Sequence, residues 1–192
     1  AELGRISSAV RDSEVLLAEL QRQGALPQVI RERQVLLPQQ YAELLRSAQA
    51  LRVQRALDLW PAFFRQALHD TAPNHLKTYV TRQLRKESQR LGAAMADPAH
   101  DRHRLRLLIK RVRYCADAYP QLVHFAPNHI KALKRAQNAL GAWHDRLQWL
   151  ARAEQEPELA PLVAQWQQEL LEAEQRADVA LERLARCLGE RA

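Results

Sequence analysis

Glycine, cysteine and long apolar runs are all scarce in this chain of 192 residues. With 5 Gly and no Asn-Gly or Asp-Gly dipeptide, the sequence lacks the hairpin signals of a β-sheet protein. No apolar run approaches the ~20 residues that span a bilayer, and the first residues, which lack a methionine, show no apolar segment of a signal peptide. The 2 Cys, Cys115 and Cys187, are too far apart for a metal-ligand spacing, so we expect reduced thiols in a cytoplasmic protein that contacts no membrane.

Helix-forming residues dominate what is present. Leu, Ala, Arg, Gln and Glu are abundant, and 47% of the residues are hydrophobic, which is enough for a substantial core. We interpret the 9 Pro as boundaries between helices. The sequence therefore predicts an all-α fold, a helical bundle of long antiparallel helices in a single domain over residues 1–192. The expected helices cover residues 3–23, 39–58, 60–70, 73–95, 98–119, 126–154 and 159–188.

An apolar stripe identifies the last of these helices as a core element. Its members recur at steps of three or four residues, which places them on one side of a helix. They are Leu162, Trp166, Leu170, Ala173, Ala177, Leu181, Leu184 and Leu188. We expect this stripe to pack on other helices and to have no direct role in function.

Positive charge is concentrated in one segment of the chain. The formal net charge is +7, but residues 73–147 hold 15 Lys+Arg against 5 Asp+Glu, a net of +10, whereas the remainder has a net of −3. Clustered cations repel one another, and an anionic partner relieves that repulsion. The asymmetry therefore favours an anionic ligand over a general role in solubility.

The stretch HRLRLLIKRVRY, residues 103–114, divides into two faces when it is wound as a helix. At about 100° per residue, four of its basic side chains and Tyr114 share a face about 100° wide, while Arg104 and Arg111 lie on a flank. We call the basic members of this face the basic stripe: His103, Arg106, Lys110 and Arg113. The opposite, apolar face carries Leu108, Ile109, Val112, Cys115 and Ala116. A solvated face usually interleaves acids with bases, so an anion-binding face competes here with the simpler interpretation of a solvated helix.

The basic stripe resembles the signature of the CHAD family, which are all-helical domains named for their histidines. The matching pattern is His103-x-x-Arg106-x-x-x-Lys110-Arg111-x-Arg113-Tyr114. A second stretch, LKRAQNALGAWHD at residues 133–145, is similar to the family's Leu-x-x-x-Gln-x-x-Leu-Gly-x-x-x-Asp helix. It is represented by Leu133, Gln137, Leu140, Gly141 and Asp145. The two motifs also occur in the family's order and at a fitting separation.

The family is built from two similar helical halves, and the N-terminal stretch resembles the end of the first half. SSAVRDSEVLL, residues 7–17, is similar to the family's Leu-Gly-x-x-Arg-Asp stretch, with Ser7 and Ser8 in place of the Leu-Gly pair. We therefore expect the chain to hold the second pseudo-repeat plus part of the first. The first histidine-motif helix would then precede residue 1. This matters because the resemblance implies an anion site that both halves form.

CHAD domains bind inorganic polyphosphate, and the resemblance implies the same function here. Some stand alone, some follow a triphosphatase-type domain, and they are associated with polyphosphate granules in the cytoplasm. The main candidates for polyphosphate contact are His103, Arg106, Lys110 and Arg113. Further candidates are Arg82, Arg85 and Lys86 on one expected helix and Lys131, Lys134, Arg135 and Asn138 on another. For each of these two further sets, a solvated helix face is an equal alternative.

Three other functions remain open: a nucleic-acid-binding helical protein, an accessory domain of a triphosphatase-type enzyme, and a scaffold that docks an acidic protein. Nucleic-acid binding fits the charge, but only Tyr114 among the aromatic residues clearly lies on the basic face, which disfavours base stacking. Phosphate hydrolysis generally needs a metal held by clustered carboxylates, and the five acids of residues 73–147 are dispersed. We therefore expect a binder without catalytic activity, metal or cofactor.

Overall fold

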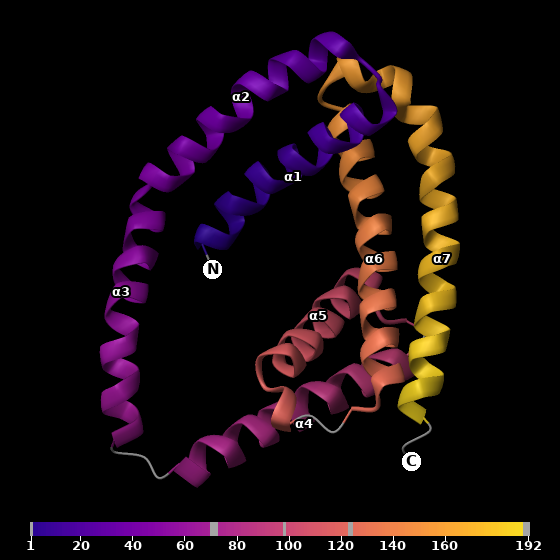
Figure 1. Ribbon diagram of the computed structural model, residues 1–192. Coiled ribbons are helices and arrows are strands. Elements are labelled where there is room, and N and C mark those ends of the chain that lie inside the picture. Colours follow the sequence, from indigo (N-terminus) through magenta and orange to yellow (C-terminus); the bar gives the residue numbers. More distant parts are fainter. Residues whose placement is uncertain (1, 70–72, 98, 123–124, 190–192) are drawn as a thin grey trace. The chain divides into compact units, whose positions relative to one another are not determined.

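The structure, a computed structural model, describes residues 2–69, 73–97, 99–122 and 125–189. Within these ranges the chain forms seven α-helices, two short 3-10 helices and no strand (Figure 1). The expected all-α helical fold is thus confirmed. The chain comprises two compact units, residues 1–71 and residues 72–192. The expectation of a single domain over residues 1–192 stays a prediction.

The first unit contains α1 (Glu2–Gln23), α2 (Pro27–Arg46) and α3 (Ala48–His69). A tight turn joins α1 to α2, and its residues Gly24 (φ +64) and Leu26 (φ 53) adopt left-handed backbone conformations. Glycine tolerates this conformation because it has no Cβ. Pro27 then occupies the start of α2, where its missing N–H would have no helical partner in any case.

The predicted helix boundaries in this unit, 39–58 and 60–70, are wrong. α2 continues through Pro38 and α3 continues through Pro61, so neither proline ends or begins a helix. The break lies at Ser47, whose hydroxyl donates to the Leu44 carbonyl (2.7 Å) and accepts from the Ala50 N–H (3.1 Å). A serine that satisfies backbone groups in this way is a strong N-cap. The predicted end at residue 70 lies outside the described residues.

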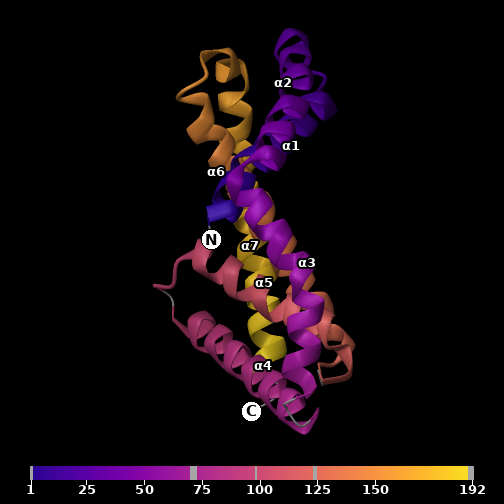
Figure 2. The same cartoon turned by 90° about the vertical axis from the view of Figure 1, so that its left-hand side faces the viewer.

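The second unit contains α4 (Pro73–Ala96), α5 (Arg102–Ala118), α6 (Pro127–Ala153) and α7 (Val163–Gly189), with 3-10 helices at Pro120–Leu122 and Pro157–Leu162. α6 and α7 lie side by side in both views (Figure 1, Figure 2). They are antiparallel, because Arg146 pairs with Glu169 near one end while His129 contacts the Cys187 carbonyl near the other. α5 packs on α4 and on α6, and α4 also contacts α7.

One hydrophobic core holds the four helices of the second unit together. α5 contributes the fully or nearly fully buried Leu105, Ile109 and Val112, while Leu108 and Cys115 are half-buried. The predicted apolar face of this helix is therefore confirmed. The predicted stripe of α7 is confirmed as well: its buried members are Leu162 (in the preceding 3-10 turn), Trp166, Ala173, Ala177 and Leu184. Cys115 and Cys187 are both free thiols.

Two boundaries of the second unit also differ from the sequence-based ones. The predicted start of α5 at residue 98 lies outside the described residues, and the helix begins at Arg102. α7 begins at Val163 rather than at residue 159, because a 3-10 turn that contains Pro161 precedes it. In the described part of the chain, no helix combines the length and apolar character required to cross a bilayer.

The core of the second unit makes a prediction about stability. Ile109→Ala removes a side chain with 0% exposure and should lower the free energy of unfolding, by about 2–5 kcal/mol because the neighbouring helices cannot collapse fully onto the cavity. Leu107→Ala on the same helix is the control, since Leu107 is 39% exposed and surface changes cost about 0.5 kcal/mol or less. Urea unfolding followed by circular dichroism measures both, and equal losses would contradict this packing.

Candidate anion-binding site

Asp101 determines where the basic helix starts. Its carboxylate accepts hydrogen bonds from the backbone N–H groups of His103 (3.2 Å) and Arg104 (3.1 Å), which is the geometry of an N-cap. The bond from His103 is the largest cause that holds the pKa of Asp101 below its ordinary value of 3.8. This cap places His103 in the first turn of α5 and so sets the register of the stripe that follows.

Arg102 anchors the same helix end to α7. Its guanidinium donates to Glu174 (2.6 Å) and to Asp178 (2.9 Å), and it lies 6.0 Å from the centre of the Trp143 ring. The hydrogen bond to Asp178 is the largest cause that raises the pKa of Arg102. Two carboxylates therefore already compensate this cation, so its role is to hold α5 on α7 rather than to attract a ligand.

Arg106 and Lys110 differ from Arg102 in having no carboxylate partner. No described acidic side chain lies within ion-pair distance of either residue. Both are half-buried, and the Lys110 ammonium lies 5.6 Å from the centre of the Tyr114 ring. One helical turn separates the two residues, so their charges lie close together along one flank of α5. An anion at this flank would meet two uncompensated cations.

Arg113 is a more constrained member of the stripe. Its Nε donates to the Gln137 side chain of α6 (2.6 Å), and its Nη1 pairs with Asp117 (2.6 Å). The guanidinium also lies 4.7 Å from the centre of the Tyr114 ring. These contacts orient the side chain and use part of its donor capacity. Arg113 can therefore offer a ligand only its remaining N–H groups.

His103 lies beside a histidine that the sequence-based candidate set missed. The rings of His103 on α5 and His144 on α6 are 5.2 Å apart between centroids. Together with the Arg113–Gln137 bond, this contact shows that the stripe occupies the flank of α5 that faces α6. His144 follows Gln137 by seven residues, so the two share one face of α6. That spacing was the available signal for His144.

The structure separates the four α6 candidates. Lys131, Lys134, Arg135 and Asn138 are all exposed. Lys131 and Arg135 line an open groove between α6 and α7. Lys134 and Asn138 lie on the outer surface of α6 and do not line that groove. The four residues thus form one exposed polar face, part of which turns towards α7.

The α4 candidates do not join the stripe. Arg82, Arg85 and Lys86 are exposed, and by helical rotation each lies about 100° or more away from the core-facing side at Leu84 and Leu91. α4 packs on α5 and α7, whereas the stripe lies where α5 meets α6. The structure therefore places these three cations on a different part of the surface of this unit.

Three arginines of α7 were missed by the sequence-based site. Arg176, Arg183 and Arg186 line the α6–α7 groove opposite Lys131 and Arg135. Their spacing of seven and three residues puts them on one face of the helix. This periodicity is visible in the sequence, but α7 was interpreted only through its apolar stripe. The packing of α7 on α6 brings the three arginines into the same groove.

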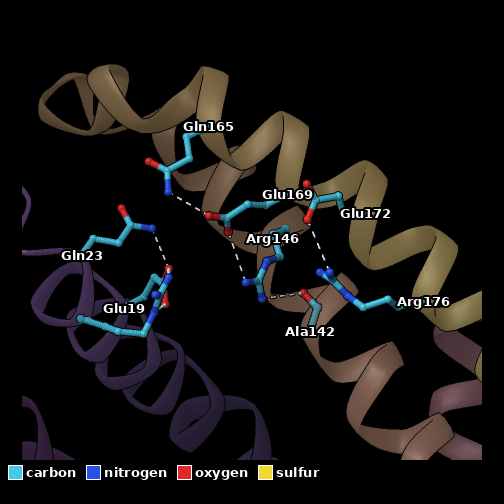
Figure 3. Close-up of polar contacts among 9 residues, drawn as sticks. Glu19, Gln23, Ala142, Arg146, Gln165, Glu169, Glu172 and Arg176 are labelled. Atoms are coloured by element: carbon cyan, nitrogen blue, oxygen red, sulfur yellow. Dashed lines mark hydrogen bonds and ion pairs between the residues drawn. The ribbon is translucent and has the colours of Figure 1, made fainter.

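Figure 3 contrasts a compensated arginine with an exposed one on the same helix pair. Arg146 of α6 donates to Glu169 (3.2 Å) and to the Ala142 carbonyl (3.2 Å), and Glu169 also accepts from Gln165 (2.9 Å). Further along α7, Arg176 makes a longer contact of 3.4 Å with Glu172. The Arg146 pair is mostly buried and structural, whereas the Arg176 pair is more than half exposed and weak.

The α5 stripe and the second motif on α6 both lie inside a family match. A family model described as the CHAD domain matches residues 1–154. The chain belongs to the CHAD family. Comparison with curated proteins and with solved structures found no further match. The CHAD match includes α5 and α6 with both motifs, whereas α7 begins beyond its last residue.

No metal centre is evident in the described part of this CHAD domain. No cluster of three or more His, Cys, Asp or Glu side chains there could hold a metal ion. The carboxylates at the two ends of α5 already have structural partners: Asp101 caps the helix, and Asp117 pairs with Arg113. The stripe itself presents cations and N–H donors.

The Asp101 cap makes a prediction about pH. Because the folded-state pKa of Asp101 lies below 3.8, its charge-dependent contribution to stability is complete above that value and is lost as the pH falls through the folded-state pKa. Asp101→Asn keeps a capping side chain without the charge. Its unfolding midpoint in urea should therefore lie below that of the wild type at pH 7, and the gap should narrow towards pH 3.

Asp58→Asn is the matched control for this measurement. Asp58 lies in an exposed stretch of α3 and accepts no hydrogen bond within the described residues. The control should leave the pH profile of the wild type unchanged. A gap between Asp101→Asn and the wild type that stays constant from pH 7 to pH 3 would contradict the cap.

Proposed function

We propose that this CHAD domain binds inorganic polyphosphate without catalysing its hydrolysis. The observation that carries the proposal is the pair of uncompensated cations, Arg106 and Lys110, one turn apart on the flank of α5 that faces α6. Polyphosphate is an unbranched polyanion with charge on every unit, so repeated cation contacts suit it. Arginine offers planar forked donors to phosphate oxygens, and lysine offers a mobile point charge.

Neighbouring groups on the same flank support the assignment. His103 and His144 lie together at the N-terminal end of the stripe, and Gln137 orients Arg113 at the other end. A phosphate chain laid along α5 would meet an imidazole N–H, then Arg106 and Lys110, and then the remaining donors of Arg113. We further propose that this binding directs the protein to polyphosphate granules in the cytoplasm.

The distribution of acids supports binding rather than hydrolysis. Metal-dependent phosphate hydrolysis needs carboxylates that are free to hold the ion. Asp101 and Asp117 are instead engaged by the helix end and by Arg113, while Glu174 and Asp178 are engaged by Arg102. These carboxylates stabilise the basic helix and its packing on α7, so their negative charge already serves the fold.

Nucleic acid is the competing polyanion, and the environment of Tyr114 disfavours it. Base stacking requires an aromatic ring with a free face. The Tyr114 ring is contacted by the Lys110 ammonium at 5.6 Å and by the Arg113 guanidinium at 4.7 Å. A stacking base would compete with these cations for the ring, whereas a phosphate would bind the cations themselves.

The specificity test is a titration of the protein with long-chain polyphosphate, tripolyphosphate, single-stranded RNA and duplex DNA at two salt concentrations. Polyphosphate should bind most tightly, its affinity should increase with chain length, and added salt should weaken it because binding releases counterions. RNA binding of equal strength under the same conditions would rule out specific recognition of polyphosphate.

The residue test is the double variant Arg106→Ala/Lys110→Ala. Each lost contact between a charged donor and phosphate is worth about 1.5–3 kcal/mol, so long-chain polyphosphate should bind at least about tenfold more weakly. Circular dichroism should show unchanged helical content, since neither residue belongs to the buried core.

Arg52→Ala/Arg55→Ala is the control of equal charge. Both arginines are exposed on α3, so this variant removes two positive charges without touching the stripe. It should weaken polyphosphate binding by no more than about threefold, because exposed charges act at a distance only through a screened potential. Equal effects of the two double variants would show that net charge, and not the stripe, determines affinity.

A further inference from the structure

The groove between α6 and α7 is a second basic feature of this unit, with a volume of about 940 Å³. It is open to solvent along one side, and its floor includes the small or short side chains Ala132, Ala180 and Val179. Its polar lining is dominated by cations from both helices. They are Lys131 and Arg135 of α6 and Arg176, Arg183 and Arg186 of α7.

Negative charge does little to compensate these cations. Glu172 is the one acidic residue among the lining side chains, and its 3.4 Å contact with Arg176 joins two groups that are each more than half exposed. Such a pair contributes little. Lys131, Arg135, Arg183 and Arg186 have no carboxylate within ion-pair distance among the residues that the structure describes. Their mutual repulsion therefore favours an anion in the groove.

The cations are spaced along the groove rather than gathered at one point. Arg176 and Arg183 are two helical turns apart, which corresponds to about 10 Å along α7, and Arg186 follows after a further turn. Lys131 and Arg135 are one turn apart on the facing helix. A linear anion could therefore meet cations successively from both walls, which a single phosphate ion could not do.

The exposed face of α6 connects the groove to the basic stripe. Gln137 lies on the side of α6 that meets α5, because its side chain accepts a hydrogen bond from Arg113. Lys131 lies on the side that meets α7, because it lines the groove. About 120° of helix surface separates the two, and Lys134 lies about midway. Since Lys134 and Asn138 are exposed, a polyanion that crosses α6 would remain beside polar and positively charged groups.

We propose that the α6–α7 groove is a second phosphate-binding site, and that long-chain polyphosphate crosses the outer face of α6 to occupy the groove and the stripe together. This inference rests on the proposed function, since it uses the same ligand class. It extends binding to α7, which lies beyond the residues of the family match. One short oligophosphate molecule can fill only one of the two sites, so two such molecules bind each protein. One long chain fills both sites and gains affinity because its two bound segments are linked.

The first test counts sites by isothermal titration calorimetry with tripolyphosphate. The wild type should bind two molecules per chain. Arg183→Ala/Arg186→Ala should bind one, at the stripe, and Arg106→Ala/Lys110→Ala should bind one, at the groove. Arg183 and Arg186 are both exposed, so helical content should be unchanged in circular dichroism. Two bound tripolyphosphates in the α7 variant would overturn the proposed groove site.

The second test measures affinity for long-chain polyphosphate. Arg183→Ala/Arg186→Ala should weaken it at least about tenfold and reduce its salt dependence, because fewer counterions are released. Glu172→Gln, which keeps the side-chain shape and removes the one lining carboxylate, should strengthen it. The control variant Arg52→Ala/Arg55→Ala should have little effect.

The two proposals fail in different ways. If the α7 variant behaves as the wild type in both tests while the stripe variant loses binding, the groove inference is wrong and the proposed function stands. If neither variant changes polyphosphate binding, both proposed sites are misplaced, and if the wild type does not bind long-chain polyphosphate, the proposed function itself is wrong. An acidic peptide that competes for the groove while long-chain polyphosphate does not would also overturn the inference, because the groove would then serve a protein partner.

Discussion

The packing of α6 between α5 and α7 is the constraint on which the functional surface depends. Leu133 and Leu140 are almost fully buried at 1% and 0% exposure, and burying side chains of this size contributes about 1.5–3 kcal/mol each. Once these residues face the core, helical geometry leaves Lys131, Lys134 and Arg135 on the outer side of α6. The same packing brings α5 and α7 against opposite flanks of that outer face. Apolar burial thus determines where the positive charge lies.

The arginines of the second unit fall into two groups according to their partners. Arg102 and Arg146 bind carboxylates of α7 and hold helices together. A partly buried charge is costly unless it is paired and hydrogen-bonded, which explains why both have acidic partners. Arg106, Arg183 and Arg186 have no such partner among the described side chains. Arg183 and Arg186 are exposed, whereas Arg106 is half-buried, and an anion would compensate the unpaired charge of all three.

Helical periodicity predicted much of this fold. The prolines, however, predicted wrong helix boundaries in the first unit, where a serine cap determines the break. The apolar faces of α5 and α7 follow from steps of three and four residues, and both are buried as expected. Pro38 and Pro61 suggested boundaries because an interior proline costs about 3 kcal/mol, yet both helices continue through them. Ser47 marks the break because its hydroxyl satisfies backbone groups at the helix ends. A proline removes one hydrogen bond within a helix that can still continue, whereas a capping side chain stabilises the end of one helix and the start of the next.

The sequence by itself determined the helical class, the CHAD resemblance and the residues that share the basic face of α5, because these depend on composition and on spacing within one helix. Only the tertiary structure decided which cations are already compensated. Arg102 meets Asp178 across 76 residues, and Arg113 meets Gln137 across 24. It also placed His103 beside His144 and aligned the α7 arginines with Lys131 and Arg135. Such contacts depend on how separate helices pack, and the spacing within a single helix contains no information about its neighbours.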